Sequence, residues 1–163
     1  MHDEWALRID AIWNDETHSD DDRVARIDAV AGERPARDAV ALFERAGARD
    51  AAGLEQDAAP LYRAALDAGL DDAHRPQAVI QLASTLRNLG RADEAVRMLQ
   101  AEVDREPVSP LRDEAAAFLA LALVSLGRER EAASLALLTL APHLTRYTRS
   151  VTSYAEQLRE DAR

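Results

Sequence analysis

The segment "QLASTLRNLGRADEAVRMLQAEVDREP", residues 81–107, decides the fold because one glycine separates two amphipathic patterns. Before Gly90, apolar residues recur at i, i+3, i+4 and i+7, the spacing that places them on one face of an α-helix. They are Val79, Leu82, Ala83 and Leu86. Gly90 stands where a helix ends in a left-handed conformation that a Cβ disfavours. The segment therefore predicts a helix that stops at Gly90.

A second helical pattern follows Gly90. Its apolar residues are Ala92, Ala95, Val96, Leu99 and Val103. Asp93 and Glu94 fall in its first turn, where they stabilise the positive end of the helix dipole. Pro107 ends the pattern, because the residue before a proline is disfavoured in a helix. The two patterns together predict a helical hairpin, in which the small Ala95 lets the helices approach closely.

The hairpin recurs on both sides of this segment. Gly53 and Gly127 each lie 37 residues from Gly90. Aligning the glycines places Ala58 and Ala132 on Ala95, and apolar residues again match apolar residues. A repeat of this length built from two helices is typical of an α-solenoid, because one hairpin cannot cover its own apolar face.

These hairpins resemble tetratricopeptide repeats, whose pattern has apolar, small, glycine and proline residues at fixed offsets. The second hairpin matches it at Val79, Leu82, Ala83, Leu86, Gly90, Ala95, Leu99 and Pro107. The wording "QLASTLRNLGRADEAV" and, near the end, "LTRYTRSVTSYAEQL" also resembles the bacterial stand-alone proteins of tetratricopeptide repeat group five. The resemblance covers roughly residues 36–160. It implies an all-α, right-handed α-solenoid of helical hairpins that acts as a non-enzymatic protein-interaction module.

We expect three segments in the chain. Residues 1–35 form acidic N-terminal capping helices, one near residues 3–14 and one capped by Asp20 or Asp21. Three hairpins follow within residues 36–143, at about 36–70, 75–107 and 110–142. Residues 144–163 form a C-terminal amphipathic helix. Five residues depart from the repeat pattern. Arg45 and Arg49 stand where apolar residues are expected, so the first hairpin is degenerate or packs differently. Glu102 and Thr139 replace a small residue late in the second helix of a hairpin, and Pro60 lies inside a predicted helix.

Composition excludes several classes of protein. The net charge is −10, without any Lys or Cys, and residues 1–22 alone carry −7. No basic stripe could displace counterions from phosphates, so nucleic acid is a poor partner. The acidic start is unlike a secretory signal, and the most apolar run (115–127) is too short to cross a bilayer. We expect a cytoplasmic protein without a membrane partner.

The sequence offers no convincing catalytic or metal site. The four His residues are dispersed, and neither a Gly-rich phosphate loop nor a nucleophile elbow occurs. The run "HSDDDR" (18–23) reads as a helix cap on a solvated turn, because it lacks the spaced ligands of a calcium loop. Ser84 and Thr85 have no His within a helical turn that could act as a base. We therefore expect no enzyme activity, no metal and no cofactor.

The expected binding surface follows from the resemblance. In tetratricopeptide solenoids the first helix of each hairpin lines the concave face, and its non-core positions, here called the concave row, point at the ligand. Our candidates for a peptide-binding groove are Phe43, Asp50, Gln77, Gln81, Ser84, Arg87, Asn88 and Phe118. The wider row adds Val40, Glu44, Gly47, Ile80, Glu114, Leu121 and Ser125.

Amide and guanidinium groups in this row can exchange hydrogen bonds with the backbone or carboxylate of an extended peptide. The alternative is that the row is only a solvated helix face. The Lys, Asn and Arg clamp with which some tetratricopeptide modules hold chaperone C-termini is not encoded. The matching positions hold Phe43, Gly47, Gln81, Glu114 and Phe118.

A second hypothesis places the functional surface at the C-terminus. Apolar residues recur there at alternating spacings of three and four. They are Leu144, Tyr147, Val151, Tyr154 and Leu158. The stripe is either a cap on the last hairpin or a dimerisation surface formed by Tyr147, Val151, Tyr154 and Leu158. Group-five relatives look like dimer formers, so the alternative function is a self-assembling homodimer.

Overall fold

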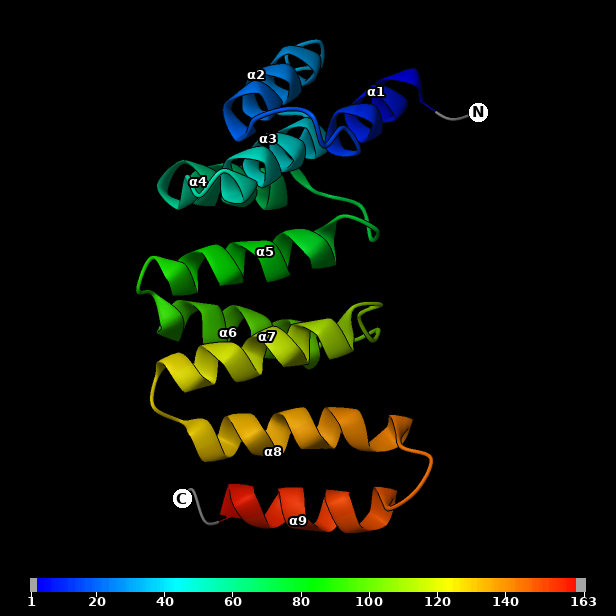
Figure 1. The fold of residues 1–163 in the computed structure, drawn as a ribbon, viewed down its shortest axis with the longest axis vertical. Helices are drawn as coiled ribbons and strands as arrows, with labels where there is room; N and C mark the ends of the chain where they lie inside the picture. Colours follow the sequence, from blue (N-terminus) through cyan, green and yellow to red (C-terminus); the bar gives the residue numbers. More distant parts are fainter. Residues whose placement is uncertain (1–2, 161–163) are drawn as a thin grey trace. The chain divides into compact units, whose positions relative to one another are not determined.

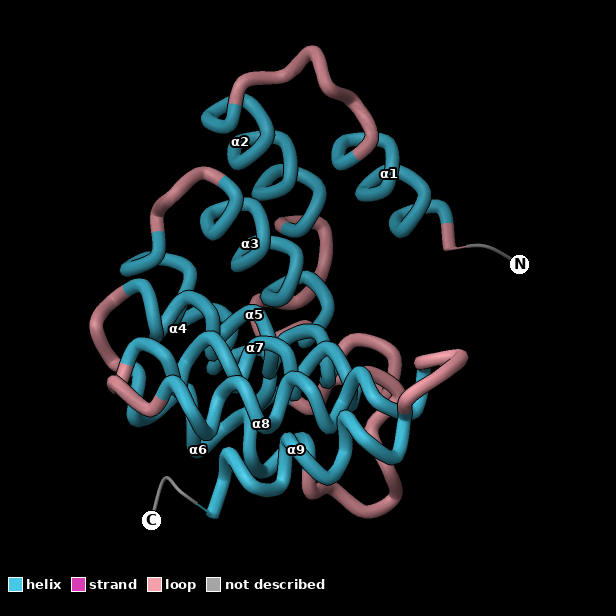
Figure 2. Tube along the Cα trace, turned by 60° about the horizontal axis from the view of Figure 1, so that its bottom comes forward, coloured by secondary structure: helices cyan, strands magenta, loops and turns pink. Residues whose placement is uncertain are grey.

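The computed structural model describes residues 3–160, which form nine α-helices, one short 3-10 helix and no strand (Figure 1). Short loops connect the successive helices (Figure 2). The chain divides into two compact units, Met1–Thr85 and Leu86–Arg163. The all-α fold class and the repeated helical hairpins predicted from the sequence are confirmed.

The first unit contains α1 (Glu4–Trp13), α2 (Asp20–Ala31), α3 (Ala39–Ala51) and α4 (Glu55–Ala68). Each of these helices packs on the next along the chain. Helix α5 (Arg75–Asn88) begins in this unit and ends in the second. The N-terminal core joins α1 and α2: Trp5 and Ile9 pack with Ile27, Val30 and Ala31.

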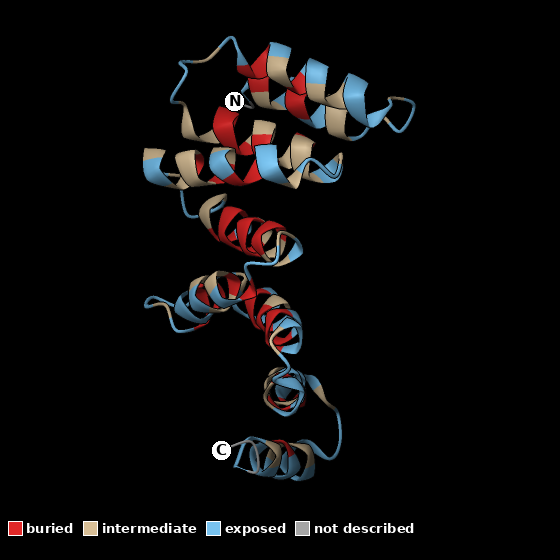
Figure 3. Cartoon of the chain, turned by 90° about the vertical axis from the view of Figure 1, so that its left-hand side faces the viewer, coloured by how far each residue is buried: buried red, intermediate tan, exposed pale blue. Residues whose placement is uncertain are grey.

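The second unit contains α6 (Ala92–Val103), α7 (Arg112–Ser125), α8 (Glu129–Leu140), the 3-10 helix η1 (Ala141–His143) and α9 (Thr148–Glu160). Each of its α-helices packs on its neighbour along the chain. Helix α9 is mostly exposed, which Figure 3 shows as the pale blue helix beside the C-terminus, and Ala155 is its buried residue. A polar outer face of this kind is what the end of a repeat protein requires.

Three identical turns link the helices of the hairpins. Gly53, Gly90 and Gly127 have φ values of 71°, 76° and 72°. At Gly90 the glycine N–H donates to Arg87 O (3.0 Å), and the Arg91 N–H donates to Leu86 O (2.8 Å). The same two bonds, from the glycine and from the residue after it, recur at Gly53 and Gly127. Each turn is therefore a Schellman motif, and the left-handed conformation predicted for Gly90 is confirmed.

The hairpin core is also as predicted. Val79, Leu82, Ala83 and Leu86 are buried, and Figure 3 shows α5 as a mostly buried helix. Ala58, Ala95 and Ala132, which follow the three turns at the same offset, are buried as well. Small side chains at this position leave room for the neighbouring helix.

Two details of the helix ends differ from the sequence-based expectation. The cap of α2 is Ser19, whose hydroxyl accepts from the Asp22 N–H (3.2 Å), so assigning it to Asp20 or Asp21 was wrong by one or two residues. Those aspartates lie in the first turn, where their charge favours the helix dipole. Helix α9 begins at Thr148, so Leu144 and Tyr147 precede it.

Arg45 and Arg49 do not face an apolar core. The Asp28 carboxylate on α2 receives bonds from Arg45 Nε (2.8 Å) and from Arg49 (2.8 and 3.0 Å). Burial opposes the charge of Asp28, but the Arg49 and Arg45 bonds outweigh it and lower the pKa of this carboxyl. The first hairpin therefore joins α2 through an ion-paired cluster where the repeat pattern expects apolar contact.

Candidate protein-interaction surface

On α3 the concave row consists of the half-buried Val40 and of Phe43, Glu44, Gly47 and Asp50, here called the α3 row. Phe43 is buried, and its ring lies 6.1 Å from that of Tyr62 and 5.8 Å from that of His74. Its side chain is part of the packing of the first unit. It therefore offers little surface to an outside ligand in this conformation.

The Trp13 indole, at the end of α1, covers the middle of the α3 row. Its Nε1–H donates to Glu44 Oε2 at 2.7 Å. A Cβ on Gly47 would lie 3.4 Å from the indole Cζ2, an ordinary contact distance, so the ring packs directly beside this glycine. From α2, the Arg23 guanidinium lies 5.8 Å from the ring centroid, within the range of a cation–π contact. Burial raises the pKa of Glu44, although the Trp13 bond partly opposes the shift.

Asp50 is half-buried and binds two hydroxyl groups. Thr85 Oγ1 donates to Asp50 Oδ1 at 2.9 Å, and Tyr62 Oη lies 3.3 Å from Asp50 Oδ2. Burial raises the pKa of Asp50, and these two hydrogen bonds partly offset the rise. Thr85 and Tyr62 are themselves fully buried. Asp50 thus connects the end of α3 to α4 and α5.

The α5 candidates lie along one side of that helix. Gln77 is exposed and its amide donates to Ala73 O (3.1 Å), whereas Gln81 and Ser84 are half-buried. Arg87 donates to the exposed Asn88 side chain (3.2 Å). Two atoms, Gln81 Oε1 and Arg87 Nε, are shielded from water and have no hydrogen-bond partner in the described part of the chain. Shielded polar atoms of this kind are rare and costly.

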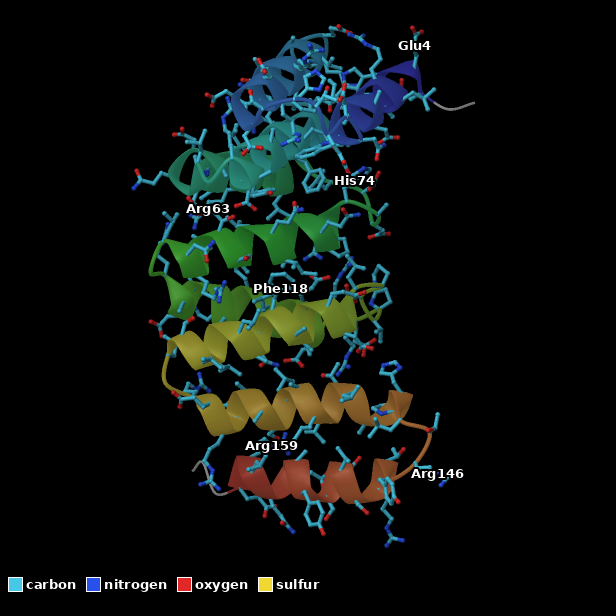
Figure 4. All side chains as sticks on the ribbon, in the orientation of Figure 1. Glu4, Arg63, His74, Phe118, Arg146 and Arg159 are labelled. Carbon is cyan, nitrogen blue, oxygen red and sulfur yellow. The ribbon has the colours of Figure 1, made fainter. Side chains whose placement is uncertain are left out.

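The candidate Phe118 lies on α7, where Figure 4 labels it, and it is half-buried. Its neighbours Leu121 and Val124 are 48% and 49% exposed, high values for aliphatic side chains in the middle of a helix. The exposed Glu114 and Ser125 belong to the same row on α7. The middle of the concave row is therefore bonded to other side chains and acidic on α3, and apolar on α7.

The C-terminal candidates divide into two pairs. Tyr147 and Tyr154 are 76% and 66% exposed, whereas Val151 and Leu158 are half-buried. Helix α9 joins α8 at Ala155, whose carbonyl accepts from Ser134 Oγ at 2.6 Å. Tyr147 has a φ of 65°, a conformation that few non-glycine residues adopt.

The described residues show no cluster of three or more His, Asp or Glu side chains that could hold a metal ion. In the "HSDDDR" segment, His18 pairs with Asp15 (3.0 Å), Asp20 pairs with Arg23 (2.7 Å), and Ser19 and Asp22 form the helix cap. None of the described helices is long and apolar enough to span a membrane.

A comparison with protein families identifies the repeat. The family model described as "Tetratrico peptide repeat", that of group five, matches residues 39–158. The chain is a tetratricopeptide repeat protein. No curated protein and no solved structure gives a match. Tetratricopeptide repeats generally mediate contacts between proteins and are not enzymes, which agrees with the class of function predicted from the sequence.

Sequence reasoning on this tetratricopeptide repeat protein missed the role of Trp13. Trp13 lies on the first of the expected N-terminal capping helices, and nothing in that expectation indicated a bond to Glu44 on α3. One signal was available: Gly47 interrupts a helical pattern in the concave row, where glycine lowers helix stability. A small residue at such a position indicates that another group approaches the backbone closely.

Proposed function

We propose that this protein binds a segment of a partner protein along the concave row of its tetratricopeptide hairpins, without catalysis. The observation that carries the proposal is the polar row along one side of α5, where the half-buried Gln81 and Arg87 and the exposed Asn88 present amide and guanidinium groups. A peptide backbone supplies donors and acceptors at regular spacing, and a carboxylate would bind the guanidinium. Membership of a family of protein-interaction modules supports the same conclusion.

Capture experiments with two double variants test this function. Arg87→Ala with Asn88→Ala removes the Arg87 and Asn88 side chains without touching the buried stripe of α5. A charge-assisted hydrogen bond contributes roughly 1.5–3 kcal/mol, so capture of a co-purifying protein should weaken about tenfold or more.

The matched control replaces an equally polar pair on α6, Arg97→Ala with Gln100→Ala. Both positions are exposed, and we expect capture to be unchanged. Loss of capture in the control pair, with no effect of Arg87 and Asn88, would place the ligand on the other side of the hairpin and refute the assignment.

A second candidate function is self-assembly into a homodimer through the C-terminal residues. The exposed rings of Tyr147 and Tyr154 favour it, because exposed aromatic side chains can supply a large apolar contact area to an interface. Light scattering of Tyr154→Asp tests it: a wild-type dimer should become a monomer. A wild type that is monomeric at high micromolar concentration would dispose of this candidate.

A further inference from the structure

Helix α7 has apolar residues on both of its faces. The inner face is buried and consists of Ala115, Ala116, Leu119, Ala120, Ala122 and Leu123. The outer face, here called the α7 outer face, consists of Ala117, Leu121 and Val124, with the half-buried Phe118 beside them. Residues 115–127 contain no charged side chain. A solvated helix face is normally polar, so this one is unusual.

The internal repeat shows what such a face contacts. Helices α3 and α7 end in the same Schellman turn, at Gly53 and Gly127. The two glycines therefore align the two helices residue by residue. Counting back six residues pairs Gly47 with Leu121, and counting back nine pairs Glu44 with Phe118. On α3 these two positions are the ones covered by the Trp13 indole. In the first unit, a large side chain from another helix therefore covers the two positions that correspond to Phe118 and Leu121.

The chemistry of the two positions differs between the repeats. On α3 the occupant donates its indole N–H to the Glu44 carboxylate, and its ring packs beside Gly47. On α7 an aromatic ring replaces the carboxylate and an aliphatic side chain replaces the glycine. At Phe118 and Leu121 an occupant therefore finds no charge and no acceptor in a side chain, and apolar contact would stabilise its binding. The polar residues of this row on α7, Glu114 and Ser125, lie one turn away at either end.

We propose that the α7 outer face binds an uncharged, apolar anchor side chain (Leu, Phe or Met) from a segment of a partner protein. The proposal rests on the proposed function and deepens it, because it assigns the chemistry of the partner's side chain and the helix that contacts this side chain. A segment whose anchor is charged should be rejected, since burying a charge against Phe118 and Leu121 without a partner is costly.

Selection from a random peptide library displayed on phage tests the proposal on the full chain. Peptides enriched on the wild type should carry Leu, Phe or Met anchors, and Leu121→Asp should weaken their binding at least tenfold. The matched control is Leu7→Asp: Leu7 on α1 is 50% exposed, close to the 48% of Leu121. This control should bind like the wild type. Leu121→Gln serves as a second variant should Leu121→Asp lose helical signal in circular dichroism.

Three outcomes would overturn the proposal. Peptides that bind Leu121→Asp normally but no longer bind the Arg87→Ala, Asn88→Ala variant would show that the α7 outer face is not the binding site. The proposed function would still stand. A wild-type dimer that Leu121→Asp converts to a monomer would show that a second copy of the chain covers this face. Enrichment of charged anchors, or no enrichment over an unrelated protein, would contradict the partner chemistry; if lysate capture also failed, the proposed function would fall with it.

Discussion

Replacing Gly90 by valine isolates the contribution of one left-handed residue to stability. Gly90 has a φ of 76°, and a Cβ built there meets no atom within 4 Å. Crowding therefore adds nothing, and the cost comes from the backbone alone. A residue with a Cβ pays roughly 1–2 kcal/mol in this conformation. Valine also lowers the entropy of the unfolded chain, which offsets about 0.4–1 kcal/mol of this cost. We therefore expect the free energy of unfolding to fall by about 1 kcal/mol, and the β-branched side chain of valine favours the larger losses.

Thermal unfolding followed by circular dichroism measures this loss. In a protein of this size, 1 kcal/mol lowers Tm by about 2–4 °C. Gly90→Asn should lose less, because asparagine tolerates the left-handed region. Since Gly53 and Gly127 have the same turn and equally open surroundings, valine at either position should cost a similar amount.

Gly47→Ala is the matched control, because Gly47 lies inside α3 and has no positive φ. Alanine there should stabilise the helix by about 0.5–1 kcal/mol, provided that the indole of Trp13, at an ordinary contact distance of 3.4 Å, tolerates the methyl group. An unchanged Tm for Gly90→Val would refute the reasoning. A larger loss for Gly47→Ala than for Gly90→Val would show that crowding outweighs backbone strain.

Two further predictions concern buried charge in the first unit. Because burial raises the pKa of Glu44, its contribution to stability is full below the unfolded pKa of about 4.3 and is lost as pH rises through the folded pKa. Glu44→Gln keeps an acceptor for Trp13 and should gain stability over the wild type as pH rises from 4 to 7 in urea titrations; a constant difference would contradict this. The pKa of Asp28 is lowered, so Asp28→Ala should cost about 1–2 kcal/mol at pH 7, and the cost should vanish as pH falls through the folded pKa. Glu33→Ala, which removes an exposed pair with Arg8, should cost much less at either pH; an equal cost would show that burial of the Asp28 cluster does not matter.

The hairpins could be predicted because their determinants are local. The spacing of Val79, Leu82 and Leu86 and the left-handed Gly90 each depend on a few neighbouring residues. The contacts of the candidate site could not be predicted from the sequence, since they join residues that are distant in the chain. Trp13 and Glu44 are 31 residues apart, and Asp50 and Thr85 are 35 apart.

The same limit explains Arg45 and Arg49. Their positions suggested a hairpin that is degenerate or packs differently, and their partner Asp28 lies on a helix outside the repeat pattern. A repeat pattern specifies which positions face a neighbour, whereas the neighbour itself decides whether an apolar residue or an ion pair satisfies them. The C-terminal stripe shows a related error: its spacing continued through Tyr147, but the helix begins one residue later, at Thr148.

The positions of Trp5 and Trp13 give the protein a built-in optical reporter. Both indoles belong to the first unit, and the second unit contains no tryptophan. Trp5 is buried and donates to Val30 O (2.9 Å), while Trp13 bonds to Glu44. Tryptophan emission therefore follows the melting of the first unit alone, whereas far-ultraviolet ellipticity follows all the helices. Coincident transitions in the two signals would mean that the units unfold cooperatively, and separated ones would assign a stability to each without a single substitution.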